Sequence, residues 1–188
     1  RVVGTQHLPA DDVIAAAEVP MGTSLLQIER EPISERVADL RIVDEVSVSR
    51  EFPNTILITV KERQAVAWLQ RGSTPWAVDA TGSDYRPLAS RPKHLPELKA
   101  KRSDRRSMKA TAQVATELAQ SDADIFRRVK SISAKSRDSI ELNLKSGKTV
   151  AWGDAELTEQ KARTLAALLT VSARHYDVSA PERPTTRE

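Results

Sequence analysis

Histidine and clustered carboxylates are the side chains of this chain that could bind a metal ion or transfer protons. The three histidines lie in three distant segments, and no two of them have the spacing of metal ligands: His7, His94 and His175. Two carboxylate pairs, Asp122 with Asp124 and Glu29 with Glu31, lie in polar stretches and lack the apolar surroundings that catalytic carboxylates need. We therefore expect no catalytic residue and no metal site, and we interpret the carboxylates as helix caps or solvated groups.

Composition excludes further classes of chemistry. The chain has no cysteine, which excludes disulfides, thiolate ligands and a cysteine nucleophile. Its six glycines are scattered singly, so there is no glycine-rich phosphate loop, and no Gly-x-Ser-x-Gly nucleophile elbow occurs. With 29 basic against 26 acidic residues, the net charge of +3 is too balanced for a dedicated nucleic-acid binder. The sequence thus predicts no cofactor and no nucleic-acid partner.

A basic cluster extends from Lys99 to Arg106 and is interrupted by Ser103 and Asp104. It lacks the interleaved aromatic residues on which nucleic-acid bases stack. We interpret residues 83–106 as an exposed connection, and the sequence leaves open whether its basic cluster contacts lipid.

The elements that must position these side chains begin with a compact β-α-α-β-β module. Val2-Val3 resembles the end of a strand, residues 11–18 have helical apolar spacing, and a second helix begins near Pro32. Residues 43–68 alternate between apolar and polar side chains and predict an antiparallel hairpin that turns at Pro53-Asn54. A short domain is also expected to bury the three apolar residues between the helices, Leu25, Leu26 and Ile28.

From residue 64 onwards the sequence predicts shorter strands and longer connections. A helix is expected at 107–120, and the remaining pattern is typical of strands at 65–69, 76–82, 129–135, 140–144 and 150–152. The last three of these strands would form an antiparallel meander. The fold class is therefore α+β, with a second domain that is mostly antiparallel and contains two helices.

The second of these helices closes the chain, at about Glu156–Ser172, with an expected buried stripe of Leu157, Leu165, Leu168 and Leu169. After it, Tyr176-Asp177-Val178 predicts a final strand at the edge of a sheet, where unpaired backbone groups invite a partner strand. Tyr176 is an amphipathic aromatic residue that would suit such a complex, although a core position suits it equally well.

Several short motifs, taken in order, resemble those of the FtsQ/DivIB family of bacterial cell division proteins. They are Val3-Gly4, Gly22-x-Ser24-Leu25-Leu26, Arg50-x-Phe52-Pro53-Asn54-Thr55, Glu62-Arg63-x-Ala65-Val66-Ala67, Trp76-x-Val78-Asp79-x-x-Gly82 and Leu95-Pro96-x-Leu98, with Lys161 in the closing helix. The resemblance covers most of the chain and implies a POTRA domain at 1–63, followed at 64–188 by a β domain with a C-terminal edge strand. It also implies a non-enzymatic scaffold of the divisome.

Proteins of that family are single-pass membrane proteins of the division septum, and this chain resembles their extracytoplasmic part. The resemblance implies binding to the ectodomains of FtsB (DivIC) and FtsL, and contact with FtsW and the septal transpeptidase during septal peptidoglycan synthesis. Carried over by position, the partner site falls on Arg174, Tyr176, Val178 and Ala180. One departure is Asp177-Val178-Ser179, where the family often has Asp-Leu-Arg.

Two other functions stay open at this point. A POTRA-type chaperone module would bind unfolded polypeptides for secretion or outer-membrane assembly, but tandem repeats are expected for that role and the chain shows one β-α-α-β-β unit. A cell-wall hydrolase would need a poised acid or a metal site, and the sequence shows neither.

Overall fold

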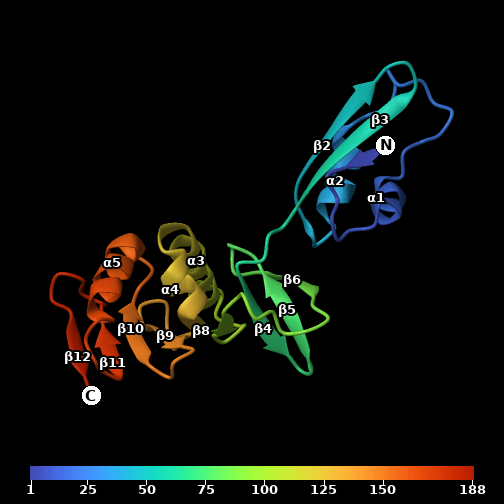
Figure 1. Cartoon of the computed structure of the whole chain (residues 1–188). Coiled ribbons are helices and arrows are strands. Elements are labelled where there is room, and N and C mark those ends of the chain that lie inside the picture. Colours follow the sequence, from blue (N-terminus) through green and yellow to red (C-terminus); the bar gives the residue numbers. More distant parts are fainter. The chain divides into compact units, whose positions relative to one another are not determined.

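The computed structural model describes all 188 residues as two compact units, Arg1–Arg63 and Gln64–Glu188 (Figure 1). Each unit combines helices with a β-sheet and has its own cluster of buried apolar side chains. The predicted α+β class is confirmed.

The first unit has the predicted β-α-α-β-β order. Its elements are β1 (Val2–Val3), α1 (Ala10–Ala17), α2 (Glu31–Ala38), β2 (Val43–Glu51) and β3 (Thr55–Glu62). In the sheet order β1-β3-β2, β1 runs parallel to β3 and β2 runs antiparallel to it. The helices bury Val13 and Val37 in the same apolar cluster as Ile58 and Val60 of β3, because both helices carry apolar residues at helical spacing on one face.

The segment between the two helices differs in part from the sequence prediction. Leu25 and Ile28 are buried, but the side chain of Leu26 is 72% exposed. Burial of Leu25 is compatible with exposure of Leu26 because neighbouring side chains of an irregular segment point in different directions. One of the three apolar residues thus remains outside the core.

Glu62, at the end of β3, holds the segment that follows β1 in place through hydrogen bonds. Its carboxylate accepts hydrogen bonds from the backbone N–H groups of Gln6 (2.6 Å), His7 (2.8 Å) and Leu8 (2.9 Å), and its side chain is only 7% exposed. Burial would raise the pKa of this carboxyl, but the donated hydrogen bonds, which stabilise its charged form, lower the pKa to about 2. Folding of the first unit is therefore coupled to ionisation of Glu62.

We expect this coupling to appear as acid sensitivity of the first unit. Because the folded-state pKa lies below the unfolded-state value, the ionised group stabilises the fold above about pH 4.5, and this contribution disappears as the pH falls to about 2. A shift of that size corresponds to about 3 kcal/mol. Urea unfolding measured between pH 6 and pH 2 should show this loss, and Glu62→Gln should be less stable at pH 6 with a flatter pH profile. An unchanged profile in Glu62→Gln would assign the acid sensitivity to other carboxylates.

The second unit is organised around one long sheet. Its elements are β4 (Ala67–Arg71), β5 (Thr74–Val78), β6 (Asp84–Pro87), β7 (Glu97–Lys99), α3 (Arg105–Ser121), α4 (Ala123–Arg128), β8 (Val129–Ala134), β9 (Ile140–Leu144), β10 (Thr149–Gly153), α5 (Thr158–Leu168), β11 (His175–Asp177) and β12 (Thr185–Arg187). The strand order is β12-β11-β10-β9-β8-β7-β4-β5-β6. The β8-β9-β10 meander is antiparallel, as predicted.

Residues 83–106 are not simply an exposed connection, which corrects the prediction. They contain β6 and β7, and the three-residue strand β7 pairs in parallel with both β4 and β8. Leu98 of β7 is 4% exposed and joins the core. This short strand therefore completes the continuous sheet, although the basic residues Lys101 and Arg102 that follow it are exposed.

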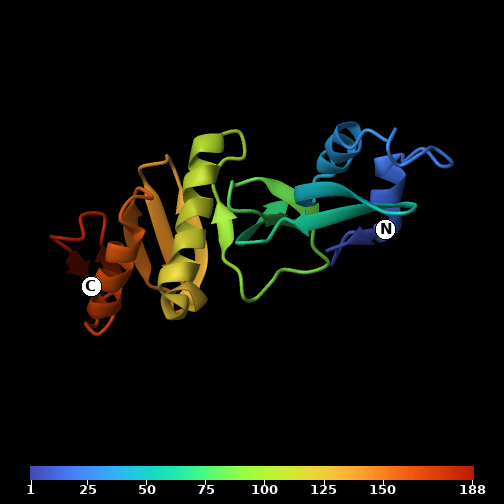
Figure 2. The same cartoon turned by 90° about the horizontal axis from the view of Figure 1, so that it is seen from above.

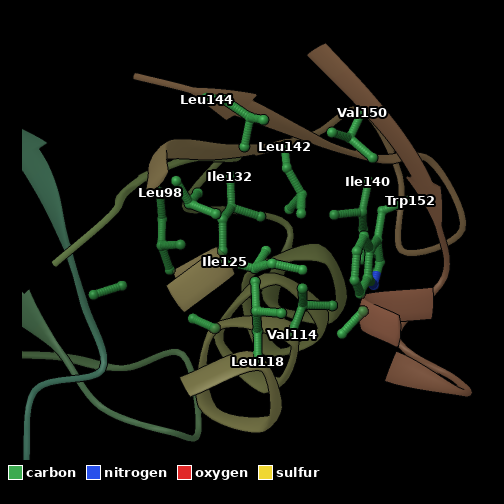
Figure 3. Close-up of a cluster of buried hydrophobic side chains, with 14 of the residues drawn as sticks. Leu98, Val114, Leu118, Ile125, Ile132, Ile140, Leu142, Leu144, Val150 and Trp152 are labelled. Atoms are coloured by element: carbon green, nitrogen blue, oxygen red, sulfur yellow. The ribbon is translucent and has the colours of Figure 1, made fainter. Parts of the chain in front are cut away.

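The core of the second unit lies between this sheet and its helices. Figure 3 shows Val114 and Leu118 of α3 facing Ile132 of β8 and Leu142 of β9, with Trp152 of β10 beside them. These labelled side chains are fully buried. The unit contains three helices, where two were predicted, because Asp122 starts the short α4 by accepting hydrogen bonds from the N–H groups of Asp124 and Ile125.

The closing helix α5 is shorter than predicted, and its buried face is different. Leu157 precedes it with a φ of +53° and a side chain that is 61% exposed. The buried positions are Thr158, Lys161, Ala162 and Leu165, so a lysine occupies the centre of the inward face. The predicted leucine stripe was wrong at Leu157 and correct at Leu165, while Leu168 and Leu169 are half-buried and pack against the core.

Candidate partner-binding edge

The exposed edge of the long sheet is β12. It pairs with β11 on one side, and the strand order ends with it. The side chains of Thr185, Thr186 and Arg187 are all exposed. A strand with one neighbour presents free backbone N–H and C=O groups, so this edge, labelled β12 in Figure 1, can accept one further strand.

The other edges are less suited to strand addition. At the opposite end of the long sheet, β6 contains Pro87, which has no N–H group to donate. In the first unit, β2 is long, but it carries the charged pair Asp44-Glu45 near its start, and Lys61 of β3 donates to Glu45 at 2.6 Å. Charged residues of this kind are common on edges that do not pair.

The expectation that Tyr176–Ala180 forms the edge itself is wrong. The strand β11 lies between β10 and β12, with Tyr176 opposite Val150 on one side and Thr186 on the other. The side chains of Tyr176 and Val178 are 1% and 0% exposed, whereas Arg174 and Ala180 lie on the surface at the two ends of the strand. Of the four predicted partner-binding residues, two are therefore buried and two are accessible.

The hydroxyl group of Tyr176 forms hydrogen bonds that hold this side chain in the core. The hydroxyl lies 2.9 Å from the carbonyl oxygen of Val171 and 3.1 Å from that of Ala173, either of which can accept its proton. It also accepts a hydrogen bond from the ammonium of Lys148 at 2.8 Å. These contacts fix the turn between α5 and β11, and so they place the strand on which β12 is built.

Lys161 and Asp154 form a second polar anchor, between β10 and α5. The Lys161 ammonium donates to Asp154 Oδ1 at 2.7 Å and to the Asp154 carbonyl oxygen at 3.1 Å. The Lys161 side chain is 2% exposed and that of Asp154 is 45% exposed. The hydrogen bond from Lys161 holds the pKa of Asp154 below its usual range, although burial opposes this. The pair fixes the start of α5 against the end of β10.

Beside this anchor, β10 approaches the segment that follows β11. A Cβ atom on Gly153, whose φ is +82°, would lie 2.9 Å from the Cβ of Ser179. The N–H of Val178 donates to the Ala151 carbonyl at 3.0 Å, which continues the pairing of β11 with β10. These contacts direct the chain after β11 into the turn that leads to β12. The sequence motifs included Lys161, but its polar character did not indicate that it is buried.

The residues considered for chemistry remain apart. His7 lies beside Glu62, His94 is exposed in the second unit, and the Nδ1 of His175 lies 2.5 Å from the hydroxyl of Thr149. No group of three or more histidine or carboxylate side chains comes together in a way that could hold a metal ion. None of the helices has the length and apolarity needed to cross a bilayer.

Comparison with known proteins identifies both units. Residues 1–63 match the family model described as POTRA domain, FtsQ-type, and residues 67–182 match that described as cell division protein FtsQ/DivIB, C-terminal. The chain is 38% identical over 188 residues to the cell division protein FtsQ of Mycobacteroides abscessus, covering 99% of this chain and 59% of that protein. It is 36% identical to FtsQ of Streptomyces venezuelae, covering 99% of this chain and 72% of the relative.

A solved structure is also similar. It is the major extracytoplasmic domain of the cell division protein DivIB from Geobacillus stearothermophilus, with a TM-score of 0.41 and 19% identity, covering 56% of this chain and 87% of that one. The chain thus spans a little over half the length of several curated relatives that it matches.

Proposed function

Because this chain belongs to the FtsQ/DivIB family of cell division proteins, we propose that it is a non-enzymatic scaffold of the division machinery. In this proposal residues 1–63 are the POTRA domain and residues 64–188 the FtsQ-type β domain. Together they form the extracytoplasmic part of a single-pass membrane protein at the division septum. The scaffold binds FtsB (DivIC) and FtsL, and it helps to assemble and regulate septal peptidoglycan synthesis with FtsW and the septal transpeptidase.

The observation that carries the proposal is the unpaired edge of β12. Strand addition needs a row of free backbone groups and pockets or charges beside it for specificity. The three side chains of β12 are exposed, and the surface residues Arg174 and Ala180 lie at the two ends of the neighbouring strand. We propose that a partner strand pairs with β12 and that Arg174 and Ala180 contact it.

Tyr176 and Val178 have a different part in this proposal. Both are buried, and they act by holding β11, and with it β12, in position. A proline at Val178 is therefore a poor probe of partner binding, because the Val178 N–H already donates to Ala151 within the sheet. The informative positions lie on β12 itself.

The test uses two neighbouring substitutions on that strand, Thr185→Pro and Thr186→Pro. Successive N–H groups of a strand point to opposite sides, so one proline removes a donor that faces β11 and the other removes a donor that faces the partner. Loss of the outward donor should weaken binding to the FtsB and FtsL ectodomains by about tenfold or more, with little change in stability. The inward proline should lower stability and serves as the matched control.

Affinity is measured by calorimetry with both ectodomains, and stability by urea unfolding. If neither proline weakens binding of the folded protein, β12 is not the partner edge. A variant at the opposite edge, Arg86→Pro in β6, should leave the affinity unchanged and controls for general effects of proline on the sheet.

A further inference from the structure

Three large apolar side chains of the first unit are largely exposed at one end. Met21 is 92% exposed, Leu26 is 72% exposed and Phe52 is 71% exposed. Met21 and Leu26 belong to the segment between α1 and α2, and Phe52 belongs to the turn between β2 and β3. We call these three residues the apolar tip. In Figures 1 and 2 the segment and the turn lie at the same end of the unit.

The apolar tip is held in place by hydrogen bonds. Arg50 of β2 donates from Nε to the carbonyl oxygen of Leu25 at 2.6 Å and from Nη2 to that of Ile28 at 2.7 Å. The side chains of Leu25 and Ile28 are buried in the core. The segment is therefore fastened on both sides of Leu26, which keeps that side chain pointing into solvent.

A groove of about 760 Å³ opens between the two segments of the apolar tip. Its lining includes Met21, Pro53 and the apolar side chains of Ile14, Val19 and Ile56. Arg1 lies on the same groove, and its backbone nitrogen donates to the Ile56 carbonyl oxygen at 2.8 Å. The first residue of the chain is thus located at the end of the unit that carries the apolar tip.

We propose that the apolar tip docks on the surface of the lipid bilayer, with Met21, Leu26 and Phe52 at the boundary between head groups and acyl chains. The proposal rests on the proposed function, in which a membrane anchor precedes Arg1. In that function the chain enters the unit through Arg1, so the end that carries the apolar tip is the end of the unit nearest to the anchor along the chain. Exposed Phe, Leu and Met side chains are of the kind that enters this boundary.

The charged residues around the apolar tip indicate whether apolar contact or charge attraction dominates its binding to lipid. Arg1 pairs with Glu51 at 2.8 Å, Arg50 is engaged with backbone carbonyls, and Arg30 stands between Glu29 and Glu31 in the sequence. No excess of positive charge is available to attract anionic lipids. Docking therefore depends on apolar contact, and it should vary little with salt or with the content of anionic lipid.

Three side chains provide too little apolar area for a free protein to stay on a membrane, so docking requires the tether. A short tether raises the local concentration of the bilayer surface to the millimolar range, about the level at which weak contacts become populated. The untethered chain should accordingly remain in solution, and the tethered chain should bring its apolar tip into the lipid.

The test attaches the chain to vesicles of neutral lipid through a histidine tag placed before Arg1 and a nickel-chelating lipid. Since the chain has no cysteine, Met21→Cys and Asp39→Cys can each carry one environment-sensitive fluorophore. Asp39 follows α2, is exposed, and provides the matched control away from the apolar tip. Brominated lipid should quench the label at position 21 at least about twofold more than the label at position 39.

The companion variant Leu26→Ser/Phe52→Ser should abolish most of this difference at position 21, since both substitutions are at exposed sites and leave the core intact. Equal quenching at positions 21 and 39 would overturn the proposal. If the label at position 21 is shielded from water only after FtsB and FtsL are added, the apolar tip contacts protein and not lipid. That result would also overturn the proposal. Binding of these ectodomains in solution, measured separately, tests the scaffold function and does not depend on this result.

Discussion

Replacing Tyr176 with alanine is expected to lower the free energy of unfolding of the second unit by about 3–5 kcal/mol, the usual cost of removing a large buried aromatic side chain. The side chain is 1% exposed, so the substitution leaves a cavity next to Val150 and Trp152 in the same core cluster. It also leaves the ammonium of Lys148 without its hydroxyl acceptor. Urea unfolding followed by tryptophan fluorescence measures the change.

The conservative variant Tyr176→Phe separates the ring from the hydroxyl. It keeps the packing and removes the hydrogen bond to the Val171 or Ala173 carbonyl, so we expect a loss of about 1–2 kcal/mol. If Tyr176 were instead a direct contact of the partner, Tyr176→Ala would reduce partner affinity in a protein of unchanged stability. That outcome would contradict the buried position of this side chain.

Replacing Asp154 with alanine is expected to cost the second unit about 2–3 kcal/mol, because it leaves the buried ammonium of Lys161 without its carboxylate. Breaking a fully buried pair costs more, but the Asp154 side chain is 45% exposed, so water can replace part of the lost interaction. The Lys161 ammonium keeps one protein acceptor, the backbone carbonyl of residue 154. Chemical unfolding at neutral pH provides the measurement.

The matched variant Lys161→Met removes the charge and keeps most of the volume of the side chain. Because the half-exposed Asp154 can then be solvated, this change should cost less than about 1 kcal/mol. In the double variant, Lys161→Met should recover most of the stability that Asp154→Ala loses, since no buried charge remains. If Lys161→Met lowers the free energy of unfolding as much as Asp154→Ala does, the attraction between the two charges contributes more to stability than the cost of leaving the buried ammonium unpaired.

Local pattern was sufficient to predict much of the first unit. The alternation through Val46 and Val48, and through Ile56, Ile58 and Val60, determines one buried face for each strand of the hairpin, and Pro53-Asn54 marks the turn between them. The helices followed from apolar spacing and from proline near the start of α2. A regular helix or strand with one buried face has a periodic pattern of apolar residues in its sequence, which predicts the element. The order of the short motifs identified the family.

Exposed or very short elements have no such signature. The strand β7 has three residues, and its place between β4 and β8 depends on pairing with residues about 30 positions away on either side. The residues of β12, Thr185–Arg187, have no apolar alternation because all three side chains are exposed. The sequence therefore predicted an edge at Tyr176–Val178, where the last apolar residues occur, and missed the strand that covers it.

The sequence by itself determined the two-part α+β organisation and the family, because both depend on local periodicity and on the order of short motifs. Only the tertiary structure decided that Tyr176 and Val178 are core residues, that Lys161 is buried and that β12 is the free edge. Burial and edge position are properties of pairing between distant segments. A lysine or a Thr-Thr-Arg sequence acquires its role only when the neighbouring strands are in place.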